Sequence, residues 1–336
     1  MKESLKIIMR GPHLHPSWLS SVTKVFPEHK FFITGPTLTP FTELHGIESN
    51  ITVIEKWDDM VKDPNWVKNY DLFLGYVDAG DPLILEPYKI PKVWRAYTPI
   101  VELPKFQAIK GNPIVFNSYT AKNLSREVQR RDFGLYPPEI VDASVCYDYK
   151  DPKIFKGWHG SERAALIVCN DFKARGETVG YKIYEKILQV NLPGVSKIPI
   201  TIIPTPGKAL TLPDLVKEYQ KHSVFLELTQ GARTISGTIM EAMMTGMPIV
   251  TVPQGDFPVL VRPFIEGFLT EDPEKIAFYI SILCNSGHEY PSALGTNARF
   301  RAIELCGETP NRLAYEEAFY KAFDPHFFLP RFWEHK

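Results

Sequence analysis

The chain has 336 residues, of which 44% are hydrophobic, 12% aromatic and 23% charged, with 38 Lys and Arg against 39 Asp and Glu. This composition is typical of a globular protein and excludes a disordered chain, a collagen and a disulfide scaffold. A formal net charge of −1 gives no overall attraction to nucleic acid, so we expect no nucleic-acid partner.

Two features bear on the location of the protein. The apolar run Leu5 to Met9 is too short for a signal peptide, and no run in the sequence approaches the roughly 18 apolar residues of a membrane-spanning helix. The four cysteines are widely spaced and form no CxxC pair, which is typical of reduced thiols. We therefore expect a cytoplasmic protein without a transmembrane segment and leave peripheral contact with a membrane open.

Short apolar runs alternate with helical patterns, which predicts an α/β fold with parallel sheets. The predicted strands of the first half are Leu5 to Met9, Lys30 to Thr34, Ile51 to Ile54, Leu72 to Tyr76, Lys92 to Ala96 and Pro113 to Phe116. Those of the second half are Ala164 to Val168, Ile200 to Ile203, Val224 to Leu228 and Pro248 to Val252. Helical periodicity indicates helices at Thr178 to Val190, Thr238 to Thr245 and Asn311 to Phe323.

The length favours two domains, since a domain typically has roughly 100–200 residues. A polar segment from Cys146 to Ser161 without clear periodicity predicts a hinge near residue 155. We expect domains at 1–155 and 156–310. Residues 311–336, a helix and an aromatic tail, are expected to pack back on the body.

Several common chemistries leave fixed spacings that this sequence lacks. It has no GxGxxG, GxxxxGK[ST], GxSxG or HExxH motif, so a dinucleotide oxidoreductase, a P-loop ATPase and an α/β-hydrolase are disfavoured. It also has no Asp-x-Asp pair, and His13 and His15 have no evident third ligand. We therefore expect neither a metal nor a cofactor.

The segment Val224 to Val252 carries most of the functional information. A strand is followed by a polar loop that leads into a helix at Gly237. The amides of Gly237, Thr238 and Ile239 would form an anion site there, and Glu241, one turn further, could accept hydrogen bonds from a sugar diol. The alternative is structural, with Ser236 as a helix cap and Glu241 as a favourable acid near the helix start.

The run Ile239 to Val250 resembles the donor-site helix and following strand of the retaining GT-B glycosyltransferases, known as family 4 or glycosyl transferases group 1. The similarity continues through Glu266 to Thr270 and Asp272 to Ala277, and covers roughly residues 160–305. It implies two Rossmann-like domains with parallel sheets facing a central cleft. The second domain would bind a nucleotide-sugar donor, and the first would lie on the acceptor side.

The resemblance also implies roles for a basic loop. Leu166 to Gly176 is similar to the strand and loop that place basic residues on the donor diphosphate, with Asn170 and Arg175 where the family has a basic pair. Lys173 and Arg175 would neutralise the diphosphate, and a solvated basic turn is the alternative. Arg233 stands where the family has a glutamate that contacts the transferred sugar.

The first half offers fewer candidates. Gly11 and His13 follow the first strand, at the end where open α/β sheets bind ligands, although a turn without a ligand explains them equally well. Tyr97 matches a family position that often holds a His near the reacting sugar. The catalytic candidates are Arg175, Lys173, Tyr97 and Arg233. The donor-binding candidates are Gly237, Thr238, Ile239, Glu241, Asn170, Gly11 and His13.

These observations predict a metal-independent glycosyltransferase that moves a sugar from a nucleoside-diphosphate donor, with retention implied by the resemblance. The acceptor, whether glycan, lipid or protein, is unknown. Two alternatives stay open: a sugar-nucleotide epimerase of the same fold, and an inactive protein that binds a nucleotide-sugar.

Overall fold

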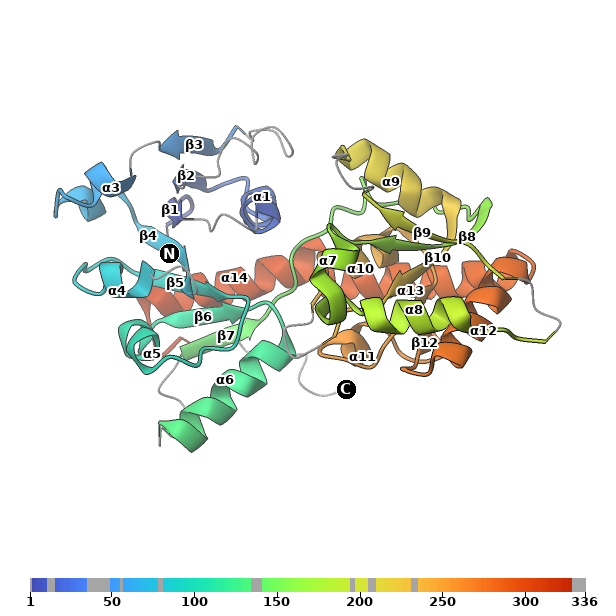
Figure 1. Cartoon of the computed structure of the whole chain (residues 1–336). Coiled ribbons are helices and arrows are strands. Elements are labelled where there is room, and N and C mark those ends of the chain that lie inside the picture. Colours follow the sequence, from blue (N-terminus) through green and yellow to red (C-terminus); the bar gives the residue numbers. More distant parts are fainter. Residues whose placement is uncertain are drawn as a thin grey trace. The chain divides into compact units, whose positions relative to one another are not determined.

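The computed structural model describes residues 2–10, 16–34, 49–54, 57–77, 81–133, 141–193, 197–204, 210–230 and 235–327. The chain forms two compact units (Figure 1). The first comprises Met1–Tyr149 and Thr309–Lys336, and the second Lys150–Glu308. The chain therefore changes units between Tyr149 and Lys150 and between Glu308 and Thr309, where the sequence predicts divisions near 155 and 310.

The first unit contains a parallel seven-stranded sheet with the order β3-β2-β1-β4-β5-β6-β7. Six strands lie where the sequence predicts them, within one residue: β1 (Lys6–Arg10), β2 (Lys30–Thr34), β3 (Ile51–Ile54), β4 (Leu72–Tyr76), β5 (Lys92–Ala96) and β6 (Pro113–Phe116). The edge strand β7 (Val141–Val145) is missing from the prediction, although its apolar and polar residues alternate as they do in a half-buried strand. Paired strands run parallel, as in β1 and β4, where Ile7 lies opposite Leu72.

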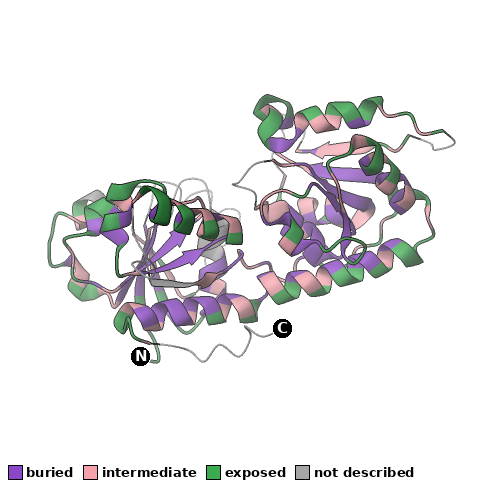
Figure 2. Ribbon diagram, turned by 90° about the horizontal axis from the view of Figure 1, so that it is seen from below, coloured by how far each residue is buried: buried purple, intermediate pink, exposed green. Residues whose placement is uncertain are grey.

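Each face of this sheet is covered by an apolar cluster, because successive strand residues point to opposite faces. Ile7 and Met9 pack with Tyr315 and Phe319 of α14 (Glu308–Phe323), whereas Ile8 packs with Trp66 on the other face. The other helices of the unit are α1 (Pro16–Val25), α3 (Trp57–Met60), η1 (Trp66–Asn69), α4 (Asp81–Leu85), α5 (Leu103–Ile109) and α6 (Tyr119–Asp132). In Figure 2 the strands are largely buried and the outer faces of the helices exposed.

The second unit contains a parallel five-stranded sheet with the order β12-β11-β10-β8-β9. Its strands are β8 (Glu162–Val168), β9 (Ile200–Ile203), β10 (His222–Glu227), β11 (Ile249–Thr251) and β12 (Gly267–Leu269). The prediction lacks β12, a three-residue edge strand. The two parallel sheets confirm the predicted α/β class.

The helices of the second unit are α7 (Phe172–Arg175), η3 (Gly176–Val179), α8 (Tyr181–Gln189), α9 (Leu212–Lys221), α10 (Gly237–Thr245), α11 (Phe257–Leu260), α12 (Pro273–Asn285) and α13 (Glu289–Cys306). Helix α8 begins at Tyr181, and the predicted start at Thr178 is wrong. Gly180 has φ of +79°, which interrupts the helical backbone, and a β-carbon there would lie 2.1 Å from the Leu228 carbonyl oxygen.

Two further findings concern membranes and cysteines. Over the described ranges, every helix is too short or too polar to cross a bilayer. All four cysteines are free thiols, and Cys146, Cys284 and Cys306 are buried. Burial raises the pKa of the Cys146 thiol to about 12 and that of Cys284 to about 11.

Candidate functional site

The strand order of the second unit defines a switch point between β8 and β10. From β8 the chain continues to its neighbour β9 on one side, and from β10 to β11 on the other. Ligands of open α/β sheets bind outside the carboxyl ends of the strands at such a point. A ligand is therefore expected near the described residues that follow these two ends: Cys169 to Gly176 after β8, and Leu228 to Gln230 and Ile235 to Gly237 after β10.

Helix α10 begins at Gly237 without a cap from the preceding side chain. Ser236 has the extended backbone of a cap residue but makes no cap hydrogen bond, and its Oγ lies 2.5 Å from Thr238 Oγ1. By contrast, Thr211 and Asp272 cap α9 and α12. Ser236 therefore stands at the N-cap position, as the structural alternative expects, but its side chain makes no hydrogen bond to the amides of the first turn.

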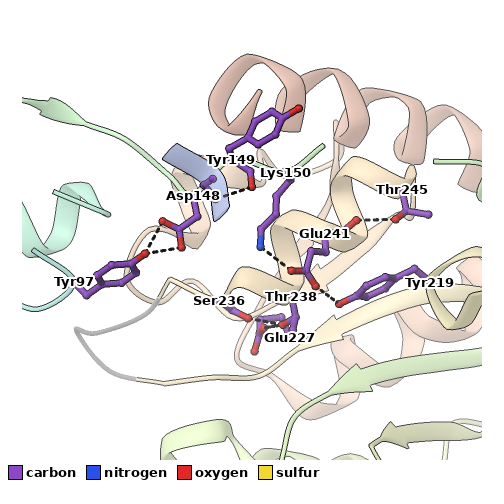
Figure 3. Close-up of polar contacts among 11 residues, drawn as sticks. Tyr97, Asp148, Tyr149, Lys150, Tyr219, Glu227, Ser236, Thr238, Glu241 and Thr245 are labelled. Atoms are coloured by element: carbon purple, nitrogen blue, oxygen red, sulfur yellow. Dashed lines mark hydrogen bonds and ion pairs between the residues drawn. The ribbon is translucent and has the colours of Figure 1, made fainter. Parts of the chain in front are cut away.

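Glu241 lies one turn inside α10, and its carboxylate contacts two side chains (Figure 3). Its Oε1 is 2.7 Å from Lys150 Nζ, and its Oε2 accepts a 3.0 Å hydrogen bond from Tyr219 Oη. The side chains of Lys150 and Glu241 are only 6% and 15% exposed. Burial, and then the charge of Glu241, raise the pKa of Tyr219 well above its usual value, so this phenol is a hydrogen-bond donor at neutral pH.

A second carboxylate, Glu227, lies at the end of β10 and is buried. Its Oε1 accepts hydrogen bonds from Thr229 N at 3.1 Å and Thr229 Oγ1 at 2.6 Å. Its Oε2 accepts a 3.5 Å hydrogen bond from Thr238 Oγ1 in the first turn of α10. Glu227 thus connects the end of the strand to the start of the helix (Figure 3).

The turn after β8 carries the predicted basic residues. Asn170, Lys173 and Arg175 are all exposed, and Arg175 Nη1 lies 3.5 Å from Cys169 Sγ. Burial raises the pKa of the Cys169 thiol, Arg175 lowers it, and Glu227 raises it further. Arg175 and Glu227 thus act in opposite directions on the pKa of the same thiol.

Backbone contacts join the segment after β8 to the segment after β10, beyond the carboxyl ends of these strands. The Gln230 amide donates a 3.0 Å hydrogen bond to the Thr178 carbonyl, and Gly180 approaches Leu228 so closely that no side chain fits there. The structure therefore brings the turn of Arg175 beside the segment that leads to α10. Seven of the predicted site residues lie in the second unit, after the neighbouring strands β8 and β10: Asn170, Lys173, Arg175, Gly237, Thr238, Ile239 and Glu241.

Tyr97 lies in the first unit, directly after β5. Its hydroxyl is 2.7 Å from both carboxylate oxygens of Asp148, which also binds Arg95. Burial and the charge of Asp148 raise the pKa of Tyr97 well above its usual value. Since its hydroxyl hydrogen is directed to Asp148, Tyr97 would reach a substrate as an acceptor rather than a donor.

The candidates Gly11, His13 and Arg233 lie outside the described residues. Among those that are described, no group of three or more His, Cys, Asp and Glu side chains is arranged to hold a metal ion. Metal independence stays a prediction.

Sequence reasoning missed Lys150, Tyr219 and Glu227. Glu227 offered a signal, because an acid inside the apolar strand Val224 to Leu228 needs a partner. Lys150 and Tyr219 offered none, because their contacts with Glu241 span 91 and 22 residues of sequence.

Two units that each contain a parallel sheet are the architecture of the GT-B fold. Residues 195–286 match the model of the family described as Glycosyl transferases group 1, which confirms the resemblance to this family over that part of the chain. No curated protein matches the sequence.

Solved structures extend the similarity over nearly the whole chain. HepE of Anabaena in complex with UDP has a TM-score of 0.69 at 13% identity, covering 94% of this chain and 99% of that one. A glycosyltransferase from Rickettsia africae has 0.67 at 14% identity, covering 96% and 100%. Sucrose-phosphate synthase of Thermosynechococcus elongatus has 0.64 at 12% identity, covering 95% and 99%. These similarities establish the fold.

Proposed function

We propose that this protein is a glycosyltransferase that moves a sugar from a nucleoside-diphosphate donor to an acceptor, with retention of anomeric configuration. The observation that carries the proposal is the uncapped first turn of α10 at the switch point, inside the segment that matches the glycosyltransferase family. Helix amides and exposed cations favour a diphosphate, and a carboxylate one turn deeper favours the adjacent ribose.

The chemistry follows from where charge develops. When the bond between the sugar and the diphosphate breaks, negative charge grows on the leaving oxygen. Arg175, Lys173 and the amides of Gly237, Thr238 and Ile239 would stabilise this charge more strongly in the transition state than in the ground state. Glu241 would hold the ribose, with its carboxylate oriented by Lys150 and Tyr219.

The remaining assignments extend this proposal. We assign the donor to the second unit and the acceptor, a glycan, lipid or protein, to the first. Tyr97 and Arg233 stay catalytic candidates, and Gly11 and His13 stay candidates for donor binding. UDP is the first nucleotide to test, because HepE was solved with UDP and with UDP-glucose. A cytoplasmic location stays a prediction from the sequence.

A thermal-shift panel of ADP, GDP, UDP, CDP and TDP tests the proposal. A ligand at about 100 times its dissociation constant adds roughly 2.7 kcal/mol to the free energy of unfolding, so one base should raise the melting temperature distinctly. The sugar esters of that nucleotide are then incubated with the protein, and the products are separated. Release of the diphosphate with a transferred or slowly hydrolysed sugar supports the proposal, and NMR of the product decides retention.

Two outcomes would replace the proposed transferase activity by another function. A second sugar nucleotide formed without an acceptor would identify an epimerase. Binding without any turnover would identify a binding protein.

A further inference from the structure

We propose that Lys150 is a ligand of the donor diphosphate, and this inference rests on the function proposed above. Lys150 is the first residue of the second unit, and its amide donates a 3.0 Å hydrogen bond to the Cys306 carbonyl. This anchor directs the side chain to α10, where the ammonium meets Glu241 (Figure 3).

The ammonium that contacts Glu241 also lies next to Gly237, the first residue of the helix. Gly237 and Glu241 are four residues apart and so share one face of α10. Nζ lies 2.7 Å from Glu241 Oε1, and a β-carbon built on Gly237 would lie 3.5 Å from Nζ. The Lys150 ammonium therefore lies beside both the carboxylate and the amide end of the helix.

This placement brings together two kinds of positive group. The N-terminus of a helix carries a partial positive charge and N–H donors, and a lysine ammonium offers donors only. The two repel each other and offer no acceptor to each other, while a buried ammonium needs compensating charge. Glu241 supplies that charge, and a phosphate at the helix start would lie next to the same ammonium.

The geometry also selects the kind of anion. A ligand here meets the ammonium and the helix amides at one end and the Glu241 carboxylate one turn away. A phosphate accepts hydrogen bonds from the first two groups, whereas a carboxylate binds hydroxyl donors. A nucleoside diphosphate carries both chemistries next to each other, in its phosphates and its ribose. Lys150 would then bridge Glu241 and a phosphate oxygen.

The competing explanation is that Lys150 acts only through Glu241, by neutralising and orienting it. A double-mutant cycle separates the two roles. Calorimetry measures the dissociation constant of the nucleoside diphosphate chosen by the panel, with UDP first, for the wild type, Lys150→Met, Glu241→Gln and the double variant. A phosphate ligand predicts that Lys150→Met weakens binding by roughly tenfold or more, both alone and in the Glu241→Gln background.

Two further variants complete the design. Lys150→Arg keeps the charge and should recover most of the affinity. Lys153→Met is the matched control, because Lys153 is exposed three residues further along the same segment, and its affinity should equal that of the wild type. If Lys150→Met fails to fold, the double variant removes both charges of the pair and is compared with Glu241→Gln alone.

Equal affinity of Glu241→Gln and the double variant would overturn the inference and leave Lys150 as a positioning residue. The proposed function has a separate point of failure, because a wild-type protein that binds none of the five diphosphates would contradict the function itself.

Discussion

Arg95, at the end of β5, is completely buried, and its Nη2 lies 2.9 Å from Oδ1 of Asp148. The two residues are 53 positions apart, and Asp148 also receives the Tyr97 hydroxyl. Arg95 Nη1 donates to the carbonyl of Phe116 at the end of β6. The segment that leaves the first unit is therefore held to the ends of two strands by a buried ion pair.

Replacing Asp148 by Ala should destabilise the protein strongly, because it leaves a buried guanidinium without its carboxylate. We expect a loss of roughly 3–5 kcal/mol in the free energy of unfolding, measured by urea denaturation. Asp59→Ala is the control, since Asp59 forms an exposed pair with Lys62 and should cost less than about 1 kcal/mol. Similar losses for both variants would mean that the Arg95 pair contributes no more than a surface contact.

Replacing Glu241 by Ala should weaken donor binding while the fold stays intact. Ribose hydroxyls left without the carboxylate cost roughly 1–3 kcal/mol, which calorimetry with the nucleoside diphosphate would register. Glu185→Ala, on the exposed side of α8, should bind like the wild type. Unchanged affinity of Glu241→Ala would remove Glu241 from the site.

Replacing Arg175 by Ala should lower kcat more than it raises KM. The charge on the leaving diphosphate grows in the transition state, so a cation that neutralises it acts mainly on the rate. Initial rates over a range of donor concentrations separate the two constants, with Lys186→Ala as the exposed control. Wild-type kinetics for Arg175→Ala would show that this residue belongs only to a solvated turn.

Sugar transfer should continue at the same rate when a chelator removes divalent metal ions. Helix amides and basic side chains are proposed to stabilise the leaving group, and the sequence has no Asp-x-Asp pair. Rates with and without excess EDTA should agree. Complete loss that magnesium or manganese restores would show that carboxylates distant in sequence converge on a metal.

His29 should make the protein less stable in acid. Burial against Phe26 lowers its pKa, so the native state holds the neutral form while the unfolded chain takes up a proton below about pH 6.5. Because the unfolded state binds more protons there, the free energy of unfolding should fall as the pH drops below that value. Urea midpoints at pH 8 and 5.5 should differ less for His29→Phe than for the wild type or for the exposed control His159→Gln. An unchanged difference would exclude His29 as the cause.

The sequence by itself determined the local elements and the fold class. Apolar runs such as Leu72 to Tyr76 and the periodicity of Thr238 to Thr245 depend on near neighbours, so they located ten of the strands and the start of α10 within a few residues. They also located Glu241 one turn into that helix. The short edge strand β12 was not predicted, because three residues are too few to show a periodic apolar pattern.

Only the tertiary structure decided what surrounds that carboxylate. Lys150, Tyr219 and Glu227 reach the helix from a connecting segment, from α9 and from the end of β10, and nothing local to each of them specifies its partner. The same holds for α14, whose Tyr315 and Phe319 return to the sheet of the first unit. Ion pairs and core contacts between distant segments depend on how whole elements pack, and this packing is a property of the folded chain rather than of any stretch of sequence.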